Sequence, residues 1–133
     1  MLGKQIGEEA GKVIGRRVLS VEGGPSVEVS LQSTGKLLGV QTRSTITYCA
    51  SVRPDGSLYG EALGVVLGKG GERATFKAQG LGTIQESGAV SYRGAQYFYS
   101  TTPKLSRLNS VATVFEYEAD AEGNSKSTLW EWK

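Results

Sequence analysis

The chain has 133 residues, an apolar fraction of 38%, and 15 basic against 13 acidic side chains, for a net charge of +2. Its basic residues are scattered, with Arg16-Arg17 as the only adjacent pair, so we expect no nucleic-acid partner, because such binding depends on clustered Lys and Arg. The absence of His and the single Cys49 exclude imidazole-based triads, the common zinc sites and an intramolecular disulfide, and we expect neither a metal nor a cofactor.

The length predicts one domain, residues 1–133, large enough to form a core without cross-links. No apolar run approaches the roughly 20 residues of a membrane-spanning helix, and the first residues contain no continuous apolar stretch typical of a signal peptide. We therefore expect a cytoplasmic protein with no membrane partner. Residues 1–10 are expected to be a loosely ordered N-terminal segment.

Turn signals recur along the whole chain and separate runs rich in Val, Thr, Tyr and Ile. Several runs alternate apolar and polar residues, as strands with one buried face do. The predicted strands are 12–21, 26–34, 41–53, 57–68, 72–83, 88–101, 110–120 and 125–132. Residues 103–108 are expected to form a single helical turn. The pattern predicts an all-β fold, an antiparallel up-and-down barrel of about eight strands, with a two-sheet β-sandwich as the alternative.

The turns of the middle hairpins imply different inward faces. A three-residue loop at 54–56 places Tyr48 opposite Ala62 on one face, with Glu61 on the other. A two-residue turn at 70–71 instead places Glu61 on the apolar face of its hairpin. A β-bulge in the strand between the two turns would reconcile them, and on this interpretation Glu61 faces the lumen.

Tyr59 and Glu61 lie two residues apart and therefore share a face of their strand. A carboxylate inside a small barrel is costly unless it is paired or protonated. This makes Glu61, with Tyr59, the candidate general base or ligand anchor. The alternative is a solvent-facing Glu beside an edge Tyr. Cys49, across the same hairpin, is expected to be a buried structural thiol, since no basic neighbour activates it.

Tyrosines are concentrated in the segment 92–99. Tyr97 and Tyr99 fall on one side of the predicted strand, and their hydroxyls could line a pocket, because a Tyr offers an apolar body with a polar tip. The alternative is ordinary barrel packing. Arg93 could neutralise an inward carboxylate.

The last hairpin carries a group of aromatic residues. A two-residue loop at 122–123 places Phe115 opposite Trp130, and Tyr117 and Trp132 then share their face. We expect this face to point inward, either as core or as the wall of a ligand pocket.

Several segments resemble a family of small uncharacterised bacterial proteins: Arg53 to Glu61, Tyr92 to Ala95, Lys104 to Asn109, Val114 to Glu118 and Leu129 to Lys133. More distantly, the Gly-rich meander resembles eight-stranded barrels of the allene-oxide-cyclase-like and lipocalin-like kind. That resemblance implies a lumen that holds an apolar ligand, and in some members a cyclisation guided by the cavity. It is a likeness of fold and assigns no catalytic residue.

Three functions follow as hypotheses. The first is the binding of a small apolar or aromatic molecule in the lumen. The second is a cofactor-independent cyclase or isomerase in the same cavity, with Glu61 handling protons. The third is a structural or interaction protein with a filled barrel, forming a homodimer through a strand face. The predicted ligand-binding residues are Tyr59, Glu61, Tyr97, Tyr99, Phe115, Tyr117, Trp130 and Trp132.

Overall fold

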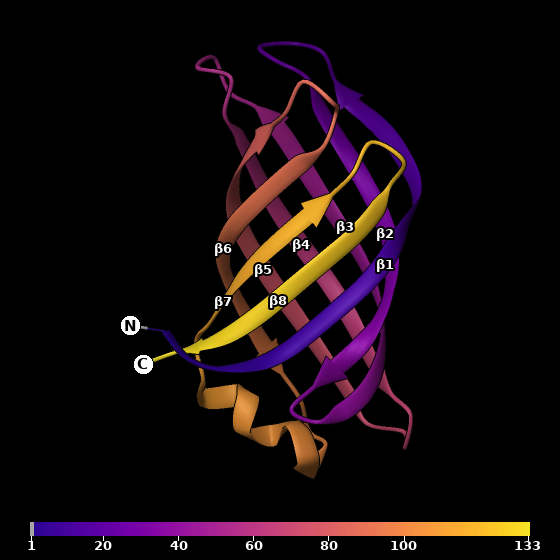
Figure 1. Cartoon of the computed structure of the whole chain (residues 1–133), viewed down its shortest axis with the longest axis vertical. Coiled ribbons are helices and arrows are strands. Elements are labelled where there is room, and N and C mark those ends of the chain that lie inside the picture. Colours follow the sequence, from indigo (N-terminus) through magenta and orange to yellow (C-terminus); the bar gives the residue numbers. More distant parts are fainter. Residues whose placement is uncertain (1) are drawn as a thin grey trace.

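Eight strands joined by short turns close into an antiparallel up-and-down barrel, in which each strand pairs with the next and the first with the last (Figure 1). The structure is a computed structural model and describes residues 2–133. The strands are β1 (Leu2–Ser20), β2 (Ser26–Leu37), β3 (Val40–Val52), β4 (Leu58–Gly68), β5 (Arg73–Ile84), β6 (Val90–Tyr99), β7 (Thr113–Ala119) and β8 (Asn124–Trp132), with a 3₁₀ helix, η1 (Pro103–Ser110), between β6 and β7. The predicted all-β barrel is confirmed, and the pairing of β1 with β8 excludes the two-sheet sandwich.

The start of the chain differs from expectation. Residues 2–10, expected to be loosely ordered, form the first half of β1, which pairs with both β2 and β8. Met1, also part of that expected segment, lies outside the described residues. Without this strand the barrel would have two open edges with unpaired backbone groups, which closure removes.

Four of the hairpin turns are built in the same way. The loops 54–56, 69–71, 86–88 and 121–123 each have three residues, and each ends in a glycine with φ between 87° and 91°. This is the three-residue hairpin in which a type I turn is followed by a left-handed residue, a position that glycine occupies without strain.

The uniform loop length corrects two predicted registers. The turn near 70–71 has three residues, so Ala62 pairs with both Tyr48 and Ala78, and β4 needs no bulge. The pairing of Tyr48 with Ala62 was predicted correctly. The bulge predicted in this strand and the inward orientation of Glu61 are both wrong: Glu61 lies on the exposed outer face.

The same correction applies to the last hairpin. Its loop is 121–123, so Phe115 pairs with Leu129 and Val114 with Trp130. A shift of one residue turns every side chain of a strand to the other face. Leu129 and Glu131 therefore point inward, Trp130 lies on the outer face, and Trp132 is 60% exposed. The predicted inward orientation of the two tryptophans is wrong.

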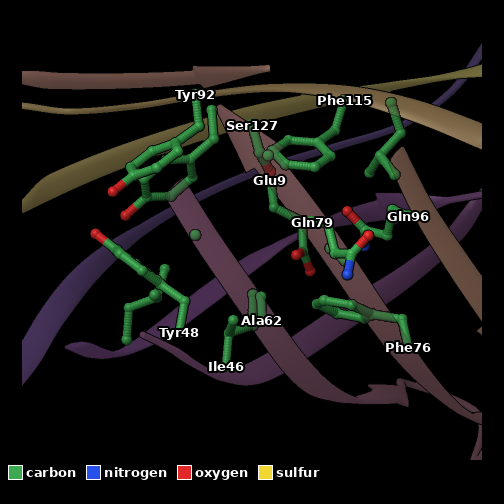
Figure 2. Close-up of a pocket in the computed structure, with 16 residues that line it drawn as sticks. Glu9, Ile46, Tyr48, Ala62, Phe76, Gln79, Tyr92, Gln96, Phe115 and Ser127 are labelled. Atoms are coloured by element: carbon green, nitrogen blue, oxygen red, sulfur yellow. The ribbon is translucent and has the colours of Figure 1, made fainter. Parts of the chain in front are cut away.

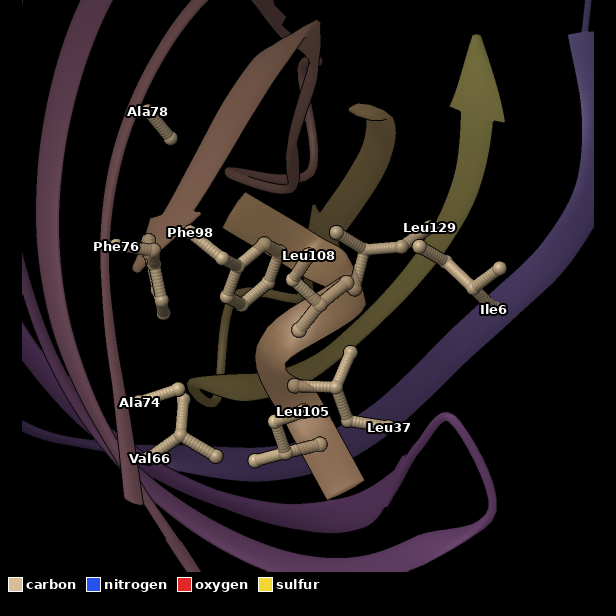
Figure 3. Close-up of a cluster of buried hydrophobic side chains, with 10 residues drawn as sticks. All are labelled: Ile6, Leu37, Val66, Ala74, Phe76, Ala78, Phe98, Leu105, Leu108 and Leu129. Atoms are coloured by element: carbon tan, nitrogen blue, oxygen red, sulfur yellow. The ribbon is translucent and has the colours of Figure 1, made fainter. Parts of the chain in front are cut away.

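One end of the barrel is closed by η1. Leu105 and Leu108 point from the helix into the barrel and are at most 1% exposed (Figure 3). The buried cluster that they complete consists of Ile6, Leu37, Val66, Ala74, Phe76, Ala78, Phe98, Leu105, Leu108 and Leu129. The predicted helical turn at 103–108 is confirmed, and its function in the fold is that of a plug.

Polar contacts attach this plug to the barrel. Arg107 donates to both carboxylate oxygens of buried Glu131 in β8. Asn109 exchanges two hydrogen bonds with the backbone of Ser100, both of 2.8 Å. At the other end of η1, Lys104 lies 3.8 Å from buried Glu72. The contacts of Arg107 and Lys104 satisfy carboxylates that would otherwise be costly to bury.

Candidate functional site

A cavity of about 70 Å³ lies in the lumen between the apolar plug and the opposite end of the barrel (Figure 2). All eight strands contribute to its wall. The lining residues are Glu9, Leu31, Ile46, Tyr48, Gly60, Ala62, Phe76, Ala78, Gln79, Gly80, Tyr92, Gln96, Phe115, Tyr117, Ser127 and Leu129.

Glycines on the inner face make room for the aromatic rings of the cavity wall. A Cβ atom at Gly82 would lie 2.7 Å from the ring of Tyr92, and one at Gly80 would lie 3.0 Å from that of Phe115. At the plug end, a Cβ at Gly64 would lie 2.1 Å from Phe76. Large rings therefore occupy the space above side-chain-free positions of strands one or two places away in the barrel.

Three tyrosines gather at the end of the cavity opposite η1. The ring centroids of Tyr48 lie 5.8 Å from Tyr92 and 5.6 Å from Tyr117, both in edge-on geometry. Figure 2 shows Tyr48 and Tyr92 on one side of the cavity, away from Phe76 and Gln96. Tyr48 and Tyr117 are half-buried, whereas Tyr92 and, nearer that rim, Leu58 and Ala119 are buried. We call the tyrosine end of the cavity the mouth, since η1 closes the other end.

The hydroxyl of Tyr117 is buried without a hydrogen-bond partner. Among residues 2–133 no group meets the distance and angle of a hydrogen bond with it, although the Tyr48 hydroxyl lies near enough to influence its pKa. Burial raises the pKa of Tyr48, Tyr92 and Tyr117, so all three phenols stay protonated at neutral pH. A buried hydroxyl with no partner is costly and is normally satisfied.

Glu9 places a carboxylate in the wall of the cavity. It accepts hydrogen bonds from Ser33 Oγ at 3.0 Å, Thr42 Oγ1 at 3.2 Å and Ser44 Oγ at 2.6 Å. All three donors are buried on the inner faces of β2 and β3. The carboxylate is therefore held by hydroxyl groups and has no cationic partner within 4 Å among the described residues.

A β-bulge in β1 brings a basic residue to the mouth. Val13 pairs with Leu31 but Gly15 with Ser30, so Ile14 is an extra residue in the strand. Beyond the bulge Arg16 pairs with the buried Val29 and shares its inward face. Bulges at barrel rims re-aim side chains in this way.

The predicted site residues are divided between the inside and the outside of the barrel. Phe115 and Tyr117 line the cavity. The others lie on the outer surface: Tyr59, Glu61, Tyr97 (55% exposed), Tyr99 (62% exposed), Trp130 and Trp132. The structure therefore does not bring the eight residues together, and the inward placement predicted for Tyr97 and Tyr99 is wrong.

Tyr59 and Glu61 are neighbours on the outer wall. The Tyr59 hydroxyl donates to Glu61 at 2.8 Å, and this bond raises the pKa of Tyr59. Arg53 lies over the Tyr59 ring, 4.9 Å from its centroid. Cys49 is half-buried on the same outer face and pairs with Glu61 across the ladder. Glu61 cannot reach a substrate in the lumen, so it is not a base for chemistry there.

The sequence analysis missed Glu9 and Arg16. Both belong to β1, whose first half was expected to be loosely ordered, and the bulge at Ile14 leaves no distinct sequence signal. Tyr48 and Tyr92 could have been found, because the three-residue loop at 54–56 already places Tyr48 opposite the small Ala62.

Among residues 2–133 no three His, Cys, Asp or Glu side chains are grouped to hold a metal ion. No helix in the described part of the chain has the length and apolar character needed to cross a membrane.

The comparisons with known proteins show the fold. No protein-family model matches the chain, and no curated protein matches its sequence. A protein of unknown function from Clostridium acetobutylicum superposes with a TM-score of 0.85 at 14% identity, over 98% of both chains. A β-barrel-like protein from Acinetobacter baumannii gives 0.83 at 11% identity, over 100% of this chain and 96% of that one. A conserved protein of unknown function from Rhodopseudomonas palustris gives 0.82 at 12% identity, over 98% and 97%.

Proposed function

We propose that the barrel binds a small apolar or aromatic molecule in its lumen, reached through the mouth formed by Tyr48, Tyr92 and Tyr117. The observation that carries this proposal is the Tyr117 hydroxyl, buried in the cavity wall without a partner. A ligand with a hydrogen-bond acceptor would satisfy it. Pockets for small molecules typically combine apolar walls with a few such polar groups.

The volume limits the size of the ligand. A water molecule needs roughly 10–15 Å³ of such space, and an apolar cavity of about 150 Å³ binds benzene. The cavity of about 70 Å³ therefore suits a short aliphatic chain, or one ring that partly occupies the mouth. Drug-sized ligands need about 300–1,000 Å³ and are not part of the proposal.

The other functions receive less support. A cyclase or isomerase in this cavity loses its assigned base, because Glu61 lies outside. The lipocalin-like use of the lumen fits the closed barrel, but the fold alone assigns no function. A homodimer through the outer face, where Leu63, Val65, Tyr97 and Tyr99 are exposed, stays a prediction, as does the cytoplasmic location.

Native mass spectrometry of the purified protein, compared with its denatured mass, tests for a bound molecule. Saturation-transfer NMR with butan-1-ol and benzyl alcohol then tests the lumen directly. Ala62→Leu adds three carbon atoms to the cavity wall and should abolish the signal. Val65→Leu enlarges an outward side chain of the same strand and should leave it unchanged. Equal signals from wild type and Ala62→Leu, or no binding to wild type of either these alcohols or the corresponding acids, butyrate and benzoate, would overturn the proposal.

A further inference from the structure

The two adjacent arginines of β1 have different surroundings. Arg17 points outward and lies 3.3 Å from Glu28. Arg16, turned to the inward face by the bulge at Ile14, has no carboxylate within 4 Å among residues 2–133. One charge of the pair is therefore neutralised on the outer wall. The Arg16 side chain is exposed, belongs to the inward face of β1, and is not among the residues that line the cavity.

Arg16 acts on the same hydroxyls that line the mouth. Burial raises the pKa of Tyr48 and of Tyr117, and the positive charge of Arg16 opposes this rise in both. The guanidinium thus lies within electrostatic reach of two phenols that remain protonated donors. Together these groups offer several donors and one full positive charge near Tyr48 and Tyr117.

A carboxylate is the complement of this donor set. It accepts hydrogen bonds through two oxygens and pairs with a guanidinium in a fork geometry. A ligand with a neutral hydroxyl or amide in this position would leave the positive charge of Arg16 without an anionic partner. A buried acceptor such as a carboxylate would also give the Tyr117 hydroxyl its missing partner.

Glu9 fixes the direction in which such a ligand lies. Its carboxylate is in the cavity wall, and three hydroxyls already donate to it. A second negative charge is repelled from this region, so the ligand's charged group belongs at the mouth and its apolar part against Phe76 and Phe115. A dicarboxylate would place one charge near Glu9.

We infer that the ligand is a small monocarboxylate, of short aliphatic chain or single ring, whose carboxylate is bound at the mouth by Arg16 and the tyrosine hydroxyls. This inference rests on the proposed function, since it names the ligand class of the same cavity. The inference also names Arg16 as a residue that determines specificity, which the binding of an apolar molecule in the lumen does not by itself require.

The test compares acids with their neutral alcohols. Dissociation constants are measured by NMR titration for butyrate against butan-1-ol and for benzoate against benzyl alcohol. Wild type should bind at least one acid about tenfold more tightly than its alcohol, as expected for one charge-assisted hydrogen bond. Arg16→Gln should remove this preference by weakening acid binding far more than alcohol binding. Arg17→Gln, which removes the same charge from the outer wall, should keep it.

The outcomes separate the inference from the proposed function. If acids and alcohols bind equally well and Arg16→Gln changes nothing, the inference is overturned while binding in the lumen stands. If neither class binds to wild type, both fail. Added salt should weaken acid binding and leave alcohol binding unaffected, because it screens exposed charges such as Arg16.

Discussion

The packing of the Phe76 ring over Gly64 can be tested by adding one methyl group at Gly64. A Cβ atom at Gly64 would lie 2.1 Å from Cε2 and 2.2 Å from Cζ of Phe76, far inside van der Waals contact. The ring cannot easily move away, because it is buried and packs against Phe98 at 5.4 Å between centroids. Overpacking a core costs about 1–3 kcal/mol.

We therefore expect Gly64→Ala to lower the free energy of unfolding by about 1–3 kcal/mol, and the melting temperature by roughly 4 °C for each kcal/mol at this chain length. Urea denaturation followed by tryptophan fluorescence measures the change. Gly15→Ala is the matched control, because no heavy atom lies within 4 Å of its added Cβ. It should be neutral or stabilise by up to about 1 kcal/mol, by restricting the unfolded chain.

A double-mutant cycle decides whether the ring is the cause. In a Phe76→Leu background the added methyl has more room, so Gly64→Ala should cost less than in wild type. The expected coupling is about 1 kcal/mol or more, as for residues in direct contact. A Gly64→Ala variant as stable as wild type, or strict additivity in the cycle, would refute the placement of Phe76 over Gly64.

Three further predictions concern buried polar groups. Arg107 holds the pKa of Glu131 below its ordinary value of 4.5, so Glu131→Gln should be less stable than wild type at pH 7, and urea denaturation should show this difference shrinking as the pH falls below 4.5 through the folded-state pKa. Tyr117→Phe removes a buried hydroxyl without a partner and should raise the free energy of unfolding of the ligand-free protein by about 1 kcal/mol, a result contradicted by any clear loss of stability in thermal unfolding. Burial raises the pKa of Tyr48, Tyr92 and Tyr117 above 10, so the folded state keeps protons that the unfolded state loses. The free energy of unfolding should therefore fall as the pH rises above 10. Tyrosinate absorbance from these three residues should appear only when the protein unfolds.

The sequence was sufficient to predict the barrel because its turns are explicit. Glycine-containing turns separate runs of strand length, and eight sequential strands close most simply on themselves. The register was harder to predict, because a turn containing glycine can be two or three residues long. The loop at 54–56 was assigned three residues and gave the correct pairing of Tyr48. The loop at 121–123 was assigned two, and this error of one residue turned the tryptophans inward.

Hydrophobicity favoured that error. Burying Trp130 and Trp132 is the expected choice when the alternative is to bury Glu131, since unpaired buried charges are costly. The structure buries Glu131 because Arg107, on η1, donates to both of its oxygens. Arg107 lies 24 residues from Glu131 along the chain, so no local sequence pattern in β8 predicts this pair.

The two ends of the barrel differ in a way that would determine how a ligand lies in the lumen. At the plug end, Leu105, Leu108 and the Arg107–Glu131 pair close the lumen, so the proposed ligand would enter from the tyrosine end. A molecule with one charged group then keeps that group nearest to solvent and to Arg16, because carrying it past Phe115 toward Glu9 would cost solvation and add repulsion. Under the proposed function, the orientation of the ligand would follow from the closure of the far end as much as from the residues of the mouth. The charge at this end depends on the bulge at Ile14. If Ile14 were paired in regular alternation, Arg17, in place of Arg16, would share the inward face, and the same barrel would present a different charge pattern at its mouth.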